Sequence, residues 1–163
     1  MKRKFLVVLS LLCLLAVSLS MFTACSEGSE ETKGSEETEG SEETEGSVRL
    51  VLDTDPVTEY EVSLSELSGE KEVPELLRYL KEKRGLEYDA TGTYLNSVGS
   101  IKNDAAASSY IYIYTSVARD FDVSSYKLET EYDGVKLVSS GVGFNEMHLE
   151  DGAIIYVTTI VWG

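Results

Sequence analysis

A stretch of 21 residues without one apolar side chain limits where this chain can fold. Residues 26–46 repeat the motif Ser-Glu-Glu-Thr-Lys/Glu-Gly three times, at 29–34, 35–40 and 41–46. They hold nine glutamates against one lysine, so the segment repels itself and buries nothing to offset the cost of ordering. We expect an acidic, disordered linker here, followed by one folded domain at 47–163.

The segment before the linker is typical of a bacterial export signal. Residues 2–4 are basic, residues 5–24 are uncharged, and residues 22–25, Phe-Thr-Ala-Cys, resemble a lipobox. The sequence therefore predicts a lipoprotein signal peptide at 1–25, ending at a lipid-modified Cys25. Two acyl chains are enough for stable attachment, so the expected partner is the lipid bilayer and the expected location is extracytoplasmic, at the cell membrane. The alternative, an uncleaved anchor, is disfavoured by four hydroxyl residues in the uncharged stretch.

Charge and cysteine content exclude several classes of protein. The chain carries a net charge of −15, and residues 47–163 carry −10 of it once the basic signal and the acidic linker are set apart. Nucleic-acid binding needs clustered lysine and arginine, so we expect no nucleic-acid partner. Cys13 lies within the signal, which leaves Cys25 as the one thiol expected in the mature protein and excludes a disulfide framework.

The domain begins with the pattern of a hairpin and a helix. Apolar residues alternate through 48–52 and again through 60–64, with turn residues at 53–56 between them. Apolar side chains then recur at helical spacing from Val73 to Leu80, and Gly85 follows as a C-terminal cap. We expect two antiparallel strands followed by one helix.

Further strands are expected at 94–98, 110–117, 135–138 and 153–162, the last two as nearly continuous apolar runs that indicate central or doubly covered strands. Strand, strand, helix and then more strands is the order of a β-grasp fold. The expected class is α+β, with a β-grasp (ubiquitin-like) sheet packed on one helix and a disordered N-terminal signal and linker.

Residues 59–162 resemble the transcobalamin-like C-terminal β-grasp domain of secreted bacterial proteins and cobalamin carriers. The matching features, in order, are Gly85-Leu86, Tyr94-Leu95, Val98-Gly99, Ile101, Tyr110 to Tyr114, and Asp151-Gly152 before Ile154. The resemblance implies the fold, and it implies cobalamin or a related corrinoid as a ligand to consider. It implies no bound cofactor.

The candidate binding residues are three tyrosines and a loop. Tyr110, Tyr112 and Tyr114 fall on one face of a strand, with isoleucines on the other face. If the isoleucines pack on the helix, the tyrosines are either covered by residues 119–145 or partly open, and an open row is a stacking surface for a ligand. Ser140 and Phe144, in the loop at 139–147, complete the candidate set.

Catalytic and metal-binding patterns are lacking in the sequence. His148 is the one histidine and no Gly-x-Ser-x-Gly motif accompanies it, so we expect an ordinary loop or strand-edge residue. Asp104, Asp120 and Asp122 do not have the spacing of an EF-hand, so we expect solvated turn residues. We expect no catalytic residues, no metal site and no enzyme. Two functions remain: a membrane-anchored module that binds a small ligand such as a cobamide, or a non-enzymatic module that contacts another surface protein or the cell wall.

Overall fold

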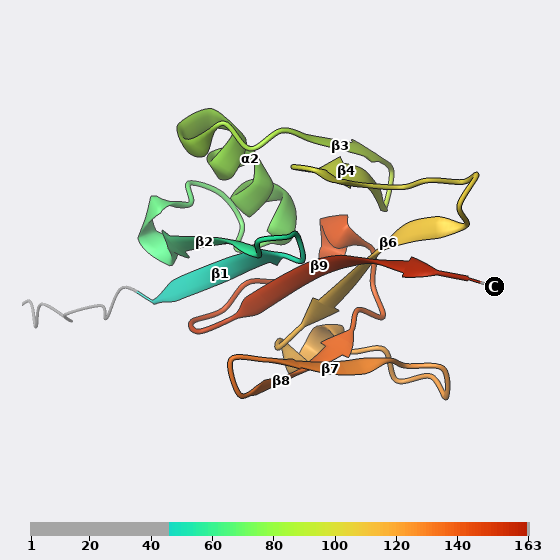
Figure 1. Ribbon diagram of the computed structural model, residues 1–163. Coiled ribbons are helices and arrows are strands. Elements are labelled where there is room, and N and C mark those ends of the chain that lie inside the picture. The colour runs from blue at the N-terminus through green and yellow to red at the C-terminus, as the bar shows by residue number, and fades with distance from the viewer. Residues whose placement is uncertain (1–45, 163) are drawn as a thin grey trace, which may run out of the picture. The chain divides into compact units, whose positions relative to one another are not determined.

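The computed structural model describes residues 46–162 (Figure 1). The predicted signal at 1–25, the lipidation at Cys25 and the linker up to residue 45 lie outside the described residues. No helix within 46–162 is long and apolar enough to cross a bilayer.

Six strands form the main sheet, in the order β2-β1-β9-β6-β8-β7. Their bounds are β1 Ser47–Leu52, β2 Thr58–Ser63, β6 Ser109–Thr115, β7 Glu129–Tyr132, β8 Val135–Ser139 and β9 Ile154–Val161. All neighbours are antiparallel except β1 and β9, which pair in parallel in the middle of the sheet. The continuous apolar sequence of β9 fits this place, because Ile154 and Ile155 point to opposite faces and both are fully buried.

One face of the main sheet is covered by the helix α2 (Val73–Arg84). Val73, Leu76, Leu77 and Leu80 are buried in a core with Leu50 and Leu52 of β1 and Ile155 and Val157 of β9. The helix ends at Gly85, whose left-handed φ of 71° favours glycine. The predicted helix, its buried stripe and its end are confirmed.

A second, three-stranded sheet extends the same layer beside the helix (Figure 1). It consists of β3 (Tyr88–Thr91), β4 (Tyr94–Val98) and β5 (Ile101–Lys102), in sequence order. Leu95, Val98 and Ile101 join the core under α2. Of these strands, the sequence predicted only β4, because β3 and β5 are short and carry few buried residues.

The opposite face of the main sheet is covered by the β8-β7 end of the same sheet, which curls back onto it. The β7-β8 hairpin bends under the sheet, so that Leu137 of β8 packs with Val51 of β1 in a second core that also holds tyrosines 112, 114, 132 and 156. Two polar contacts fix the hairpin tip: Arg49 binds Asp133 at 2.9 Å, and the Tyr132 hydroxyl donates to Glu59 at 2.8 Å.

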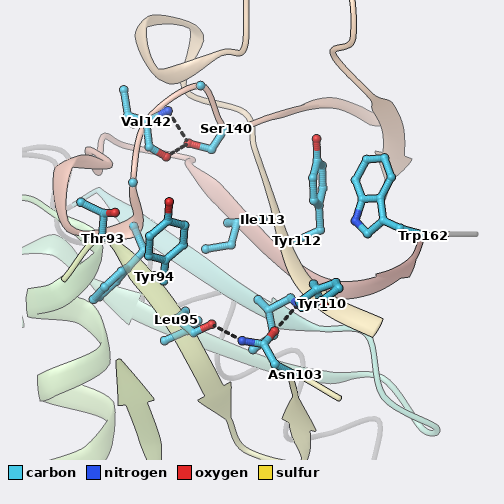
Figure 2. Close-up of a pocket in the computed structure, with 14 residues that line it drawn as sticks. Thr93, Tyr94, Leu95, Asn103, Tyr110, Tyr112, Ile113, Ser140, Val142 and Trp162 are labelled. Carbon is cyan, nitrogen blue, oxygen red and sulfur yellow. Dashed lines mark hydrogen bonds between the residues drawn. The ribbon is translucent and has the colours of Figure 1, made fainter. Parts of the chain in front are cut away.

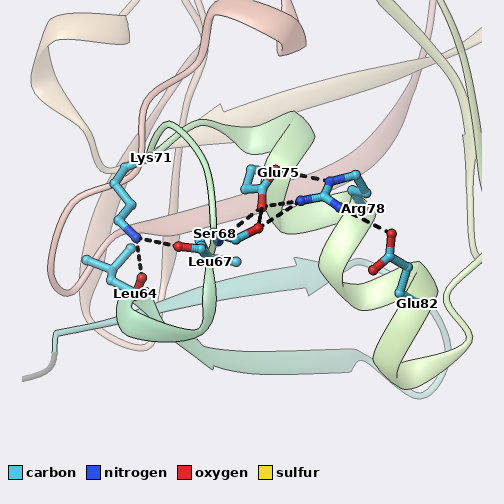
Figure 3. Close-up of polar contacts among 7 residues, drawn as sticks. All are labelled: Leu64, Leu67, Ser68, Lys71, Glu75, Arg78 and Glu82. Atoms are coloured by element: carbon cyan, nitrogen blue, oxygen red, sulfur yellow. Dashed lines mark hydrogen bonds and ion pairs between the residues drawn. The ribbon is translucent and has the colours of Figure 1, made fainter.

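The connection between β2 and α2 is held by polar side chains (Figure 3). It includes a 3₁₀ turn, η1 (Leu64–Glu66). The Lys71 ammonium donates to the carbonyl of Leu64 in this turn and to the carbonyl of Leu67 just after it. Glu75 accepts from the backbone and hydroxyl of Ser68 at 3.2 and 3.1 Å and from Arg78 at 2.6 Å. Its ion pair with Arg78 lowers the pKa of Glu75, so this contact keeps the carboxylate charged.

The α+β class expected from the sequence is confirmed: one α-helix and nine strands make up about half of residues 46–162. The sequence missed β3, β5 and β7, and it missed the 3₁₀ turns η1, η2 (Ala118–Asp120) and η3 (Phe144–Glu146). β3 and β7 are edge strands in which half-exposed residues alternate with exposed ones, so they lack the apolar alternation that reveals a strand.

Because Tyr156 is packed into the second core, we expect the domain to lose stability at high pH. Burial raises the pKa of Tyr156 from 10.0 to about 12, and the Asp53 carboxylate adds to the shift. Between these values the folded chain keeps a proton that the unfolded chain releases, so the free energy of unfolding falls as the pH rises. Urea denaturation across this range should show a shallower fall for Tyr156→Phe than for the parent; equal slopes would contradict the assignment.

Candidate ligand-binding site

A cavity of about 500 Å³ opens where the two sheets face each other, between β4 and β6 (Figure 2). The loop after β8 and the end of β9 complete it. Its lining comprises Thr93, Tyr94, Leu95, Asn103, Tyr110, Ile111, Tyr112, Ile113, Ser140, Gly141, Val142, Gly143, Phe144 and Trp162. Among these described residues none carries a charged side chain, so the cavity suits an uncharged ligand.

The cavity exists because β6 is paired unequally on its two sides. One side pairs with β9 from Ser109 to Thr115, whereas the other pairs with β8 only at Tyr114 and Thr115. On that side Ser109 is bridged to Asp104, and the segment from Ile111 to Ile113 between these pairings is an edge without a partner strand. Both Ile111 and Tyr112 line the cavity although they lie on opposite faces of β6, which places the cavity at the edge of the strand rather than on one face.

Asn103 bridges the open edges of β4 and β6 at the base of the cavity (Figure 2). Its Oδ1 accepts from the Ile111 amide at 2.6 Å, and its Nδ2 donates to the Leu95 carbonyl at 3.3 Å. A side-chain amide has one acceptor and one donor end, so a single Asn103 satisfies one group on each sheet. At the other end of the open edge, the Ser140 amide donates to the Ile113 carbonyl at 2.9 Å.

The loop at 140–144 is fitted closely between its neighbours. A Cβ placed on Gly143 would lie 2.5 Å from the Cβ of Thr93, and one on Gly141 would lie 2.9 Å from the backbone of Asp122. The two glycines therefore allow close approach, and no larger residue fits without a shift of the neighbours. The Ser140 hydroxyl donates to the Val142 carbonyl at 2.9 Å and so fixes the turn.

Aromatic side chains form the exposed wall of the cavity. Trp162 is 57% exposed and Tyr110 43% exposed, while Tyr94 stands out from the opposite sheet. Tyr112 packs edge-on against Trp162, with ring centroids 6.4 Å apart. The Trp162 amide donates to the Ser108 carbonyl at 3.0 Å, which holds the end of the chain beside β6. These rings leave apolar faces available to a ligand.

The structure brings four of the five predicted binding residues together. Tyr110, Tyr112, Ser140 and Phe144 all line the cavity. Tyr114 does not: it is 7% exposed and lies in the second core, where burial raises the pKa of its hydroxyl. The tyrosine row is thus open at one end of β6 and covered at the other, because the β7-β8 hairpin crosses only the second half of the strand.

Among the lining residues that sequence reasoning missed, Tyr94, Asn103 and Trp162 contribute most to the shape of the site. Tyr94 and Trp162 were read only as parts of strands, and Asn103 was not singled out. An isolated polar residue between two short strands was the one available signal for Asn103, and it does not distinguish a bridge from an ordinary turn residue.

His148, predicted as a loop or strand-edge residue, lies outside the cavity and pairs with a buried acid. Asp120 is fully buried, and its carboxylate accepts from the His148 amide at 2.7 Å and contacts the ring Nδ1 at 2.8 Å. It is therefore a structural acid rather than a solvated turn residue. Among residues 46–162 no hydroxyl is hydrogen-bonded to His148, and no three His, Cys, Asp or Glu side chains come close enough to share a metal.

Comparisons with known proteins give a distant structural likeness and no match in sequence. No family model matches the chain, and no curated protein matches it. Among solved structures, a crystal structure from Ruminococcus gnavus described as a "putative metal binding protein" superposes with a TM-score of 0.45 and 11% identity, covering 73% of this chain and all of that one. A likeness of this degree carries no argument about function.

Proposed function

We propose that this chain is an extracytoplasmic lipoprotein whose domain binds a small, uncharged ligand in the cavity between β4 and β6. The observation that carries the proposal is the cavity itself. Its volume of about 500 Å³ lies within the range of small-molecule sites, and its lining combines aromatic walls with a few fixed polar groups. The proposed role is binding rather than catalysis.

The charge of the domain supports the same class of ligand. Residues 47–163 carry a net charge of −10, while the cavity wall is neutral. An anion would be repelled by the surroundings, and a cation would find no carboxylate within the cavity to replace its water. A neutral molecule with an apolar or aromatic part loses the least hydration free energy when it enters the cavity. Stacking on Trp162 and Tyr110 stabilises it there.

We also propose that the main sheet is a β-grasp sheet. The β1-β2 hairpin, the helix that follows it, and the parallel placement of the last strand beside β1 support this finer assignment. The resemblance to transcobalamin-like domains makes a corrinoid the first ligand to test. Because the cavity is open to solvent on the side of Trp162, it would hold one edge of so large a ring rather than enclose it.

The alternative, a module that contacts a surface protein or the cell wall, is favoured by one other feature. Val123 and Tyr126 are almost fully exposed on the segment between β6 and β7, outside the cavity. Two exposed side chains make a small patch, and isolated apolar residues are common on protein surfaces. The cavity therefore supports the first proposal better.

Trp162 provides a direct assay for the cavity, because it is the one tryptophan of the chain. Uncharged candidates, with cyanocobalamin first, should change Trp162 fluorescence or raise the melting temperature. Removing stacking area in Tyr110→Ala should weaken binding about tenfold, since an aromatic contact contributes about 1 kcal/mol or more. Absorbance and thermal shift should be read alongside fluorescence, because cyanocobalamin itself absorbs light.

Tyr126→Ala is the matched control, since Tyr126 is also an exposed tyrosine (86%) but lies outside the cavity. It should bind like the parent. If Tyr126→Ala abolished an interaction with envelope components and Tyr110→Ala did not, the interaction module would replace the ligand-binding proposal.

The anchor is tested by the mature N terminus. Mass spectrometry of protein from its native membrane should find Cys25 as the first residue, carrying acyl chains, and Cys25→Ser should release the protein from the membrane fraction. An intact Met1 with an unmodified Cys25 would refute the lipoprotein assignment.

A further inference from the structure

The open edge of β6 leaves two backbone groups facing the cavity. Within residues 46–162, neither the Ile111 carbonyl nor the Ile113 amide has a hydrogen-bond partner. They flank Tyr112, and both residues line the cavity. An acceptor and a donor on one strand edge form the start of a β-ladder that no strand of this domain completes.

The groups on either side of this pair are already occupied. The Ile111 amide donates to Asn103 at 2.6 Å, and the Ile113 carbonyl accepts from Ser140 at 2.9 Å. Asn103 and Ser140 thus block the ladder at both ends. The space between them accommodates one residue of an incoming strand.

The direction of that strand follows from the hydrogen-bonding pattern. In a parallel pair, one residue donates its N–H to the residue before its neighbour and accepts from the residue after it. One residue opposite Tyr112 would satisfy both Ile111 and Ile113. In an antiparallel pair two residues are needed, and each would turn a second polar group toward a position that Asn103 or Ser140 already fills.

We propose that the ligand is a short uncharged peptide, with one residue bound parallel to β6 opposite Tyr112. This inference rests on the proposed function of the cavity. The side chain of the bound residue would project on the same face as Tyr112, where it meets Tyr112 and Trp162, so an aromatic or large apolar residue fits. Charged residues are disfavoured by the neutral lining.

The same geometry selects against an isolated amide, such as the acetamido group of an amino sugar. In a trans amide the N–H and C=O point in opposite directions. The Ile111 carbonyl and the Ile113 amide point out of the same strand edge, so one trans amide reaches only one of them. An aminoacyl unit reaches both, because its N–H and C=O belong to two successive amides.

The test is a titration of the full chain, in detergent micelles, with acetyl-Gly-Phe-Gly-amide. Trp162 fluorescence and the amide resonances of ¹⁵N-labelled protein report binding. We expect the Ile113 amide resonance to move downfield as it gains an acceptor. The same peptide N-methylated at phenylalanine lacks the donor to Ile111 and should bind at least about tenfold more weakly. N,N′-Diacetylchitobiose, a neutral sugar bearing acetamido groups, is the comparison ligand.

The outcomes separate the two proposals. Equal binding of the peptide and its N-methyl analogue would overturn the strand-edge inference. If cyanocobalamin or N,N′-diacetylchitobiose perturbed the cavity residues and the peptide did not, the cavity would remain a ligand site but the peptide assignment would be wrong. If no compound perturbed the cavity, both the inference and the ligand-binding proposal would fail. Perturbation by the peptide alone, lost on N-methylation and retained in Tyr126→Ala, supports both.

Discussion

The parallel pairing of β1 with β9 is the contact on which the rest of the domain depends. It joins the first and last strands of the described chain, with Arg49 opposite Ile154 and Leu52 opposite Val157. Because both strands are central, each contributes to the core on both faces of the sheet. The helix layer and the tyrosine layer are therefore held together by one pair of strands. Pairing so distant in sequence is costly to form, and it forms here between two strongly apolar segments.

The same strand arrangement produces the cavity. β9 carries β6 along its full length and delivers Trp162 to the open end of β6. On the other side of β6, the partner strand β8 ends at Ser139, and the chain continues into the loop that packs on Thr93. The second side of β6 is therefore left without a strand over most of its length. Asn103 and Ser140 satisfy the ends of that edge, and the middle faces the cavity. A site built from two regular strands and a tightly packed loop is largely preformed, which lowers the cost of ordering on binding.

The sequence was most informative where burial imposes a regular pattern. The helix from Val73 to Arg84 and the strands β1, β2, β4, β6, β8 and β9 all show apolar periodicity, and all were predicted within a few residues. The edge strands β3 and β7 lack such a pattern because neither of their faces is buried, and β5 has only two residues. The α+β fold class was predicted for the same reason. The open edge of β6 could not be predicted, because it depends on where β8 stops pairing with β6, and no local sequence pattern shows that.

The candidate site was predicted in part for a related reason. Alternation showed that Tyr110, Tyr112 and Tyr114 share a face, but it does not reveal how far a distant hairpin extends across that face. Tyr114 is covered by the β7-β8 hairpin and Tyr110 is not. Asn103 and Trp162 join the site only through tertiary structure: one spans two sheets, and the other follows a central strand.

Amide hydrogen exchange along β6 tests the central claim most directly, because it reports hydrogen bonding one residue at a time. In the free protein, the Thr115 amide, which lies in the ladder with β8, should exchange slowly, and the Ile113 amide should exchange faster by at least about tenfold. Equal and strong protection of Ile113 and Thr115 would show that the edge is already paired, and the site described for β6 would not exist.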